Sequence, residues 1–334
     1  MNKTTKKIAA GASLAALSAA VAAASSYVTT RFLVKIALDR RPPKVVQMAS
    51  TRISGGKRIS DVFLQQIEGA DRLLRQVEME TVTITAADGT ELTGHWRPHP
   101  QAKRVIIAMH GWRSTWSRDF GMIAPFWEEN GCSVLFAEQR GQNNSGGEYM
   151  GFGLTERYDV LDWIAWVTQR CGSELPIYLG GVSMGATTVL MAAGLELPGN
   201  VHGIMADCGF TSPEAIWRHV ASDNLHLPLG YWQSVADSIC KKRLQLDSMK
   251  YSTLDALKTS KIPVILAHGT DDHFVPVEMS YQNYAACAGP KRLLVVPGAD
   301  HGMSYFIDRG NYERAVRDFW REFDHPAGDS KDEE

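Results

Sequence analysis

Ser183 is the residue whose type and surroundings point most directly to nucleophilic chemistry. It is the central residue of the sequence Gly-Val-Ser-Met-Gly at 181–185. The apolar run 177–179 before it predicts a buried strand, and the residues from 186 onward predict a helix. A serine between two glycines at a strand-to-helix turn is typical of a nucleophile elbow, which lifts the hydroxyl above the carboxyl edge of a sheet. The alternative interpretation is a plain glycine-rich turn, and the strand–helix context favours the nucleophile.

A serine hydroxyl needs a general base, and His301 is the histidine that we predict for this role. It lies in the sequence Gly-Ala-Asp-His-Gly at 298–302, directly after the last predicted strand, where a loop can bring the imidazole to the sheet edge. His110 and His268 also follow predicted strands, but each is followed by a glycine, which favours a packed turn residue. His273 lies close to the candidate acids and is interpreted as a bystander.

The base in turn needs a carboxylate that orients it, and two aspartates are candidates. Asp271 and Asp272 follow the penultimate predicted strand. The chain order serine, aspartate, histidine is the order found in hydrolases built on a nucleophile elbow. From the residues alone, either aspartate could be the acid. Asp207, at the end of an earlier predicted strand, is the second choice.

Backbone amides are expected to stabilise the oxyanion of an acyl-transfer reaction. The sequence His-Gly-Trp at 110–112 follows the predicted strand 105–109, where a donor loop is expected. We predict that the N–H groups of Trp112 and Met184 form the oxyanion hole.

The elements that must position these residues predict an α/β fold. A hairpin is expected at 80–97, with its turn at Ala-Asp-Gly, 87–89. Short apolar runs then alternate with helical stretches, which predicts parallel strands buried on both faces and joined by right-handed crossovers. We therefore expect a mostly parallel, eight-stranded sheet with helices on both faces. The runs are 105–109, 133–137, 177–179, 201–206, 264–267 and 293–296, and the helices are 118–129, 156–168, 186–195, 278–286 and 311–323.

The chain divides into four predicted parts. Residues 80–325 are expected to form the catalytic domain, interrupted at about 210–260 by a small helical cap, because this stretch contains no convincing strand but many aromatic and aliphatic residues. Residues 31–79 are expected to be a linker followed by an amphipathic helix over 60–77. Residues 326–334 are a polar tail.

Residues 1–30 are expected to be a membrane anchor or a signal segment. Lys3, Lys6 and Lys7 precede an uncharged stretch, 8–30, that is long enough for one spanning helix. Small residues at Ala22 and Ala24 also fit a cleaved signal peptide, and a soluble amphipathic leader is the third alternative. We expect a single-pass membrane protein, or a secreted one after cleavage. Basic residues flank both ends, so the orientation stays open.

Composition excludes several function classes. The 334 residues carry a net charge of −2, without a basic stripe that would bind nucleic acid. The five cysteines are scattered and form no CxxC or CxxH pattern, so we expect no metal site and no organic cofactor. The cysteines are interpreted as buried or idle thiols. Nothing indicates the oligomeric state.

The residues from Glu80 to about Phe323 resemble the α/β-hydrolase superfamily. Within it, the chain is similar to bacterial membrane-tethered or exported hydrolases related to Bem46-type proteins and to the serine aminopeptidase-like group. The resemblance implies that the acid lies three residues before Val275, which selects Asp272. The family's Asp-x-Arg-Gly-His-Gly segment departs here to Glu-Gln-Arg-Gly-Gln-Asn at 138–143, a segment that usually shapes the pocket wall. The segments that carry the likeness are 110–114, 153–159, 207–213 and 268–276.

The expected activity is therefore that of a serine hydrolase that cleaves an ester of a small molecule through an acyl-enzyme. Apolar cap residues could line an acyl pocket or could simply attach the cap to the core: Trp217, Leu225, Leu227, Tyr231 and Trp232. A peptidase or amidase is the second prediction, for which Asp223 is the candidate that would bind a substrate amine. Acyl transfer to an alcohol and an inactive, membrane-tethered binding protein are the further alternatives.

Overall fold

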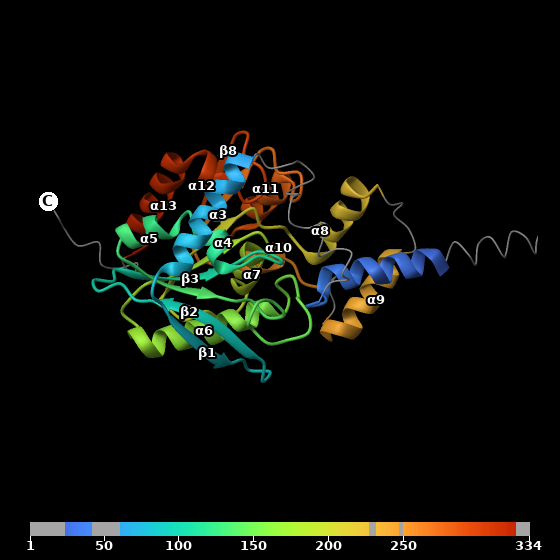
Figure 1. Ribbon diagram of the computed structural model, residues 1–334, viewed down its shortest axis with the longest axis horizontal. Coiled ribbons are helices and arrows are strands. Elements are labelled where there is room, and N and C mark those ends of the chain that lie inside the picture. The colour runs from blue at the N-terminus through green and yellow to red at the C-terminus, as the bar shows by residue number, and fades with distance from the viewer. Residues whose placement is uncertain (1–23, 42–60, 227–231, 247–249, 325–334) are drawn as a thin grey trace, which may run out of the picture.

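The computed structural model describes residues 24–41, 61–226, 232–246 and 250–324 (Figure 1). They are organised around one eight-stranded sheet with the order β1-β2-β4-β3-β5-β6-β7-β8. The hairpin β1–β2 is antiparallel, β2 pairs antiparallel with β4, and the other neighbours are parallel. The prediction of a mostly parallel, eight-stranded sheet is confirmed. The strands are β1 (Glu80–Thr85), β2 (Glu91–Arg97), β3 (Arg104–Met109), β4 (Cys132–Ala137), β5 (Ile177–Val182), β6 (Val201–Asp207), β7 (Val264–Gly269) and β8 (Lys291–Val296).

Helices cover both faces of this sheet, as predicted. Successive side chains of a strand point to opposite faces, and those of β3 enter two different apolar clusters: Ile107 packs with α6 and α7, whereas Ile106 packs with α5 and α13. In Figure 1, α3, α5 and α13 lie above β3 and α6 lies below it. One layer contains α6 (Glu156–Cys171), α7 (Met184–Ala192), α10 (Thr253–Thr259) and α11 (Val277–Ala286); the other contains α3 (Asp61–Gln76), α4 (Trp116–Phe120), α5 (Ala124–Glu129), α12 (Ser304–Ile307) and α13 (Arg309–Phe323).

The helix predicted over 118–129 is wrong in one respect, because the structure contains two short helices, α4 and α5, in its place. Pro125 lies in the first turn of α5. In the interior of a continuous helix its ring would clash with the carbonyl group of Gly121. Gly121 itself lies so close to α3 that an added Cβ would be 2.7 Å from the carbonyl carbon of Ala70.

The cap and the N-terminal helix pack together in a third apolar cluster, which also contains residues of the main domain. Among the described residues the cap comprises α8 (Pro213–His219), a π-helical turn (Val220–Asn224) and α9 (Trp232–Leu244). α10 falls in the range predicted for the cap but packs on α7 and α11. Residues 24–38 form a helix that lies beside α9 (Figure 1), and its Val34 and Leu38 pack in one cluster with Cys240 of α9. Residues 31–38, at the start of the range predicted as a linker, continue this helix.

No helix within the described ranges combines the length and apolar character that crossing a membrane requires. Several predictions fall on other residues. Residues 8–23 of the expected anchor, most of the expected linker, the cap residues Leu227 and Tyr231, and the polar tail lie outside the described residues.

Candidate active site

Ser183 lies at the sharp turn between β5 and α7, with a backbone φ of 55° and ψ of −118°. A non-glycine residue in this region costs about 1–3 kcal/mol, so the surroundings must impose it. The two glycines make the turn possible. A Cβ on Gly181 would lie 2.4 Å from the carbonyl carbon of Gly185, and one on Gly185 would lie 1.9 Å from the carbonyl oxygen of Met109. The Ser183 amide donates to the Asp207 carbonyl at 2.9 Å, which ties the turn to β6.

The structure brings Ser183, His301 and Asp272 into one hydrogen-bonded chain. His301 Nε2 lies 2.9 Å from Ser183 Oγ, and His301 Nδ1 lies 2.7 Å from Asp272 Oδ2. The three residues come from the turn after β5, the loop after β8 and the loop after β7. Parallel strands end at the same edge of the sheet, so residues far apart in the sequence meet there.

Besides the imidazole of His301, Asp272 contacts further hydrogen-bond donors. Its Oδ1 accepts the amides of Phe274 and Val275 at 2.9 and 2.8 Å. His268 Nε2 lies 3.1 Å from Asp272 Oδ2, while His268 Nδ1 lies 2.6 Å from the hydroxyl of Ser280. A hydroxyl that donates to Nδ1 leaves the proton of a neutral imidazole on Nε2, where the Val275 carbonyl at 2.9 Å and the Asp272 carboxylate are both within hydrogen-bond distance. The interpretation of His268 as a packed turn residue missed this contact with the acid.

These contacts shift the pKa values of the pair in opposite directions. Burial lowers the pKa of His301, but the Asp272 carboxylate and the Cys208 sulfur raise it by more, so that it lies well above 6.5. Burial raises the pKa of Asp272, but His301 and the bond from His268 lower it by more, so that it lies well below 3.8. Asp272 is therefore the group that stays ionised while His301 exchanges a proton.

The loop after β3 presents the Trp112 amide near Ser183. The amides on either side are engaged: that of Gly111 donates to Asp119 Oδ2 at 2.7 Å, and that of Arg113 donates to Gln142 Oε1 at 2.5 Å. No hydrogen bond joins the Trp112 amide to any residue that the structure describes. The Met184 amide is the first of α7, where helical amides have no intrahelical acceptor. Among the described residues, the amides of Trp112 and Met184 thus both have free donor capacity, and Trp112 and Ser183 line the same cavity.

The segment 138–143 supports this loop. The Gln139 side chain donates to the carbonyl of His110, and its oxygen accepts the hydroxyl of Thr188 at 2.8 Å. Asn143 Nδ2 donates to the carbonyl of Ser114 at 3.0 Å. The resemblance implied a pocket wall here, but none of the residues 138–143 lines the cavity described below. In this chain the segment therefore supports the loop after β3.

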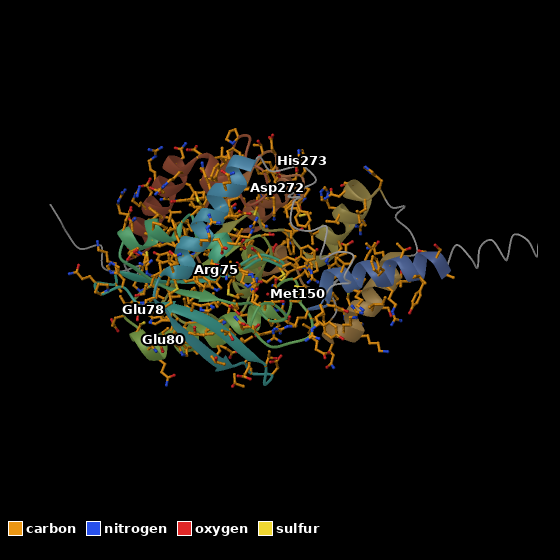
Figure 2. All side chains as sticks on the ribbon, viewed as in Figure 1. Arg75, Glu78, Glu80, Met150, Asp272 and His273 are labelled. Atoms are coloured by element: carbon orange, nitrogen blue, oxygen red, sulfur yellow. The ribbon has the colours of Figure 1, made fainter. Side chains whose placement is uncertain are left out.

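The other candidate acids and bases lie in different environments. Asp271 is exposed and accepts the hydroxyl of Thr270. Asp207 is buried and accepts the hydroxyl of Ser304 at 2.9 Å; burial raises its pKa to about 6. The His110 imidazole is fully buried. His273 is exposed, although it neighbours Asp272 (Figure 2).

Cys208 is a neighbour of the site that the sequence patterns did not reveal. Its sulfur, one imidazole nitrogen of His301 and one carboxylate oxygen of Asp272 lie within 4.8 Å of one another. This set has the donor types of a metal site. However, both ring nitrogens of His301 are hydrogen-bonded to Ser183 and Asp272, so neither has a lone pair available for a metal. Burial raises the pKa of the Cys208 thiol to about 11, which keeps it protonated.

A cavity of about 590 Å³ opens beside Ser183 and His301. Its polar lining includes the carboxylates of Glu68, Asp119 and Asp207, of which the last two are hydrogen-bonded to neighbouring groups. Most of its other side chains are apolar or aromatic. They come from α3, the α4–α5 segment, β5, β6, α12, α13 and the loops after β3, β7 and β8. They are Leu64, Ile67, Trp112, Phe120, Met122, Ile123, Trp127, Val182, Met205, Phe274, Met303, Tyr305, Phe306, Tyr312 and Val316.

None of the described cap residues lines this cavity. Trp217 packs edge-on against Phe152, with ring centroids 5.2 Å apart, so it attaches the cap to the core. Leu225 is exposed. Asp223 is exposed and lies 2.7 Å from Nδ1 of His219. Of the two alternatives for the cap residues, attachment of the cap to the core therefore applies to Trp217, and the apolar wall comes from α3 and the main domain.

Comparisons with known proteins agree with this architecture. The prolyl oligopeptidase family matches residues 118–324. YqkD of Bacillus subtilis is 27% identical over 245 residues, which cover 73% of this chain and 80% of YqkD. YfhR of Salmonella typhimurium is 29% identical over 261 residues, which cover 76% of this chain and 84% of YfhR.

Among solved structures, the esterase Pf2001 of Pyrococcus furiosus is similar with a TM-score of 0.60. The match covers 82% of this chain and 99% of the esterase, at 20% sequence identity. At this identity the likeness establishes a common fold. The predicted α/β-hydrolase fold is thereby confirmed.

Proposed function

The chain belongs to the prolyl oligopeptidase family and is an α/β-hydrolase, and we propose that it hydrolyses carboxylic esters of apolar acids through a covalent acyl-enzyme. The observation that supports this most is the position of Ser183 beside an apolar cavity, 2.9 Å from a histidine that is itself bonded to a buried aspartate. In this proposal Ser183 is the nucleophile, His301 the general base, and Asp272 the orienting acid.

The first step is the attack of Ser183 on the ester carbonyl. As the bond from Oγ to the carbonyl carbon forms, the hydroxyl proton passes to His301 Nε2. Asp272 accepts the proton on Nδ1 in a hydrogen bond and stabilises the imidazolium cation. The amides of Trp112 and Met184 donate to the oxyanion, and each such donor is worth about 2.7–4 kcal/mol if the usual cost of removal applies.

The second half of the reaction returns the enzyme to its starting state. The tetrahedral intermediate collapses, and the alcohol leaves with the proton from His301 Nε2. Water then attacks the acyl-enzyme while His301 accepts one of its protons, and the carboxylic acid leaves as Oγ recovers that proton.

The apolar lining supports a substrate with an apolar acyl group, because burying its methylene groups contributes about 0.8 kcal/mol each. The polar oxygen atoms of an ester then face the loop after β3. A peptidase or amidase is the second candidate. It is favoured by the name of the family and by Glu68 in the lining of the cavity, since an exposed carboxylate there could bind an ammonium group.

A substrate panel tests the proposal and separates the two candidates. The purified chain is given p-nitrophenyl esters from acetyl to palmitoyl beside aminoacyl p-nitroanilides, with Ser183→Ala as the control. We expect the highest kcat/KM on esters of intermediate or long acyl groups and none above background for the control. Faster hydrolysis of the anilides would favour the peptidase, and equal rates across the whole panel would contradict a selective acyl pocket.

We also propose that residues 8–30 attach the chain to a membrane. The support is the uncharged stretch after Lys3, Lys6 and Lys7. A cleaved signal after Ala24 is the alternative, and it would leave most of the helix 24–38 in the mature chain. Membrane fractionation with N-terminal sequencing of the recovered protein distinguishes the two, because an anchor is recovered uncleaved with the membranes.

A further inference from the structure

The loop that carries the Trp112 amide is held from outside the catalytic domain by the end of the N-terminal helix. The indole Nε1 of Trp112 donates to the carbonyl of Ala37 at 2.9 Å. The guanidinium of Arg113 donates through Nη2 to the carbonyls of Ile36 and Asp39, at 2.7 and 2.6 Å. Its Nη1 reaches the carbonyl of Arg40 at 3.3 Å. The two loop residues therefore donate to four carbonyl groups at one helix end, those of residues 36, 37, 39 and 40.

These contacts have a physical cause in the helix itself. The last carbonyls of a helix lack intrahelical donors and carry the negative end of its dipole. A guanidinium offers five N–H groups in one plane and stays charged, so it can satisfy several such carbonyls at once. Arg113 has a φ of 52°, a left-handed conformation that a non-glycine residue adopts only when its contacts compensate for the cost. The bonds to residues 36–40 are such contacts.

The helix end is in turn fixed to the body of the domain. Leu38 is fully buried in the apolar cluster that also contains Met184, the first residue of α7. The carbonyl of Leu38 accepts the Met150 amide at 2.8 Å, and Met150 lies where the helix meets the domain (Figure 2). The Arg40 side chain donates to the carbonyl of Asn143 at 2.6 Å. Residues 36–40 thus join the loop after β3 to the segment 138–150.

We infer that Arg113 is a positioning residue, through which residues 36–40 of the N-terminal segment hold the Trp112 amide in the geometry that stabilises the oxyanion. The N-terminal helix then contributes to the geometry of the catalytic site, in addition to any role in attaching the chain to a membrane. The inference rests on the proposed function, because it assigns the Trp112 amide to the oxyanion hole. It also means that displacement of this helix lowers the catalytic rate without changing the three residues Ser183, His301 and Asp272.

The test compares Arg113→Met, Arg113→Lys and the parent in the full chain, on the best ester of the panel. Rates are expressed per active site, titrated with a fluorophosphonate. Loss of a whole oxyanion donor costs about 10²–10³-fold in kcat, so a misplaced one should cost about 10- to 100-fold. We expect this fall in kcat for Arg113→Met with KM unchanged within about twofold. Arg113→Lys should recover part of it, because an ammonium can still donate to two of the carbonyls.

Two further measurements separate positioning from simple stability. A reversible arylboronic acid forms a tetrahedral adduct on the serine, so its affinity should fall by the same factor as kcat. The pH at which kcat/KM is half-maximal should stay in place, since His301 and Asp272 are untouched. If kcat per titrated site is unchanged and only the thermal midpoint falls, Arg113 is a structural residue and the inference is wrong.

A matched pair on the helix tests the other partner of the contact. Leu38→Ala removes a fully buried side chain, whereas Val28→Ala changes one that is 65% exposed on the same helix. We expect Leu38→Ala to lower kcat and Val28→Ala to leave it unchanged. The double variant Leu38→Ala/Arg113→Met should lose less than the product of the single losses, because both act through one contact. If the loss of kcat in the double variant equals the product of the two single losses, the inference is wrong. This comparison remains decisive even if Arg113→Met alone folds poorly.

Different results would contradict the proposed function and the role of Arg113. If the parent chain is neither labelled by the fluorophosphonate nor active on any ester, the proposed function is wrong, and the inference falls with it. If the parent is labelled and active while both Arg113→Met and Leu38→Ala keep its kcat, the inference alone is wrong.

Discussion

At the scale of single residues, the turn around Ser183 requires glycine at positions 181 and 185, because neither position has room for a side chain. Gly181 and Gly185 let β5 and α7 approach so closely that Ser183 is forced into its unusual φ of 55°. The strain is local, and the surrounding sheet and helix maintain it. The same geometry directs the hydroxyl at His301 and brings the Met184 amide beside it.

Gly185→Ala is expected to lower the free energy of unfolding by about 3 kcal/mol or more, because its Cβ would lie 1.9 Å from the carbonyl oxygen of Met109, a backbone atom that cannot move alone. Gly199→Ala is the matched control, since a Cβ there meets nothing within 4 Å. Urea unfolding of both variants measures the difference. A Gly185→Ala protein as stable as the control would contradict the packing described for the turn.

The shifted pKa of His301 predicts the pH dependence of the reaction. The base must be neutral to accept a proton, so kcat/KM should rise with pH through a midpoint above 6.5. Asp272→Asn removes the carboxylate that raises this pKa. Its midpoint should therefore move to lower pH, and kcat should fall by about 10⁴-fold, the cost of the same change in a known serine protease triad.

Asp271→Asn is the control for this experiment, because Asp271 is exposed and the chain offers it as the alternative acid. Its profile and its kcat should match those of the parent chain. A parental profile for Asp272→Asn, or a shifted one for Asp271→Asn, would reverse the assignment of the acid.

At the scale of elements, the cavity owes its apolar wall to α3 and to the segment between α4 and α5. α3 precedes the first strand in the sequence, yet its Leu64 and Ile67 line the cavity with Met122 of the α4–α5 segment. The cap, in contrast, packs on the core through Phe152 and Trp217. Selectivity for acyl length should accordingly reside in α3 and its neighbours.

Met122→Trp is expected to narrow this cavity and to lower kcat/KM for long acyl esters by at least about tenfold, while acetyl and butyryl esters change little. Met122 is half-buried, so the larger side chain has room to orient without unfolding the domain. Leu225→Ala, in the exposed part of the cap, is the control and should leave the acyl-length profile intact. A shift of the profile by Leu225→Ala alone would place the acyl group under the cap.

Sequence patterns identified the strands and the residues at their ends because these signals are local. Ser183, His301 and the pair Asp271 and Asp272 each follow an apolar run by a few residues. The bond of Arg113 to Ile36 joins residues 77 positions apart, and the bond of Gln142 to Arg113 spans 29. Neither has a periodicity or a motif that a single sequence reveals. The choice between Asp272 and Asp271 likewise required the resemblance or the structure.

At the scale of the whole molecule, the two ends of the described chain are both tied to the sheet. The N-terminal helix is held by the loop after β3, and Asp324, the last described residue, is held by the start of β3. Arg104 donates to both carboxylate oxygens of Asp324, at 3.1 and 2.6 Å, and the Tyr178 hydroxyl adds a bond of 3.0 Å. The Arg104 side chain is 8% exposed, so the Asp324 carboxylate offsets the cost of burying its positive charge.

Asp324→Ala is expected to lower the free energy of unfolding by about 3 kcal/mol, because it leaves a buried guanidinium without its counterion. Asp318→Ala removes an exposed partner of Arg321 on the same helix and should cost less than about 0.5 kcal/mol. Calorimetry or urea unfolding provides the values. Equal losses of unfolding free energy in the two variants would show that the ion pair between Arg104 and Asp324 does not anchor α13.

The central claim is that one serine, in one turn, performs the chemistry. Intact-mass analysis and peptide mapping of the chain after treatment with a fluorophosphonate test it most directly. We predict one adduct per chain, located on Ser183, and no adduct on the Ser183→Ala variant under the same conditions. An adduct that forms on another residue of the parent chain, or one that persists in Ser183→Ala, would contradict the account.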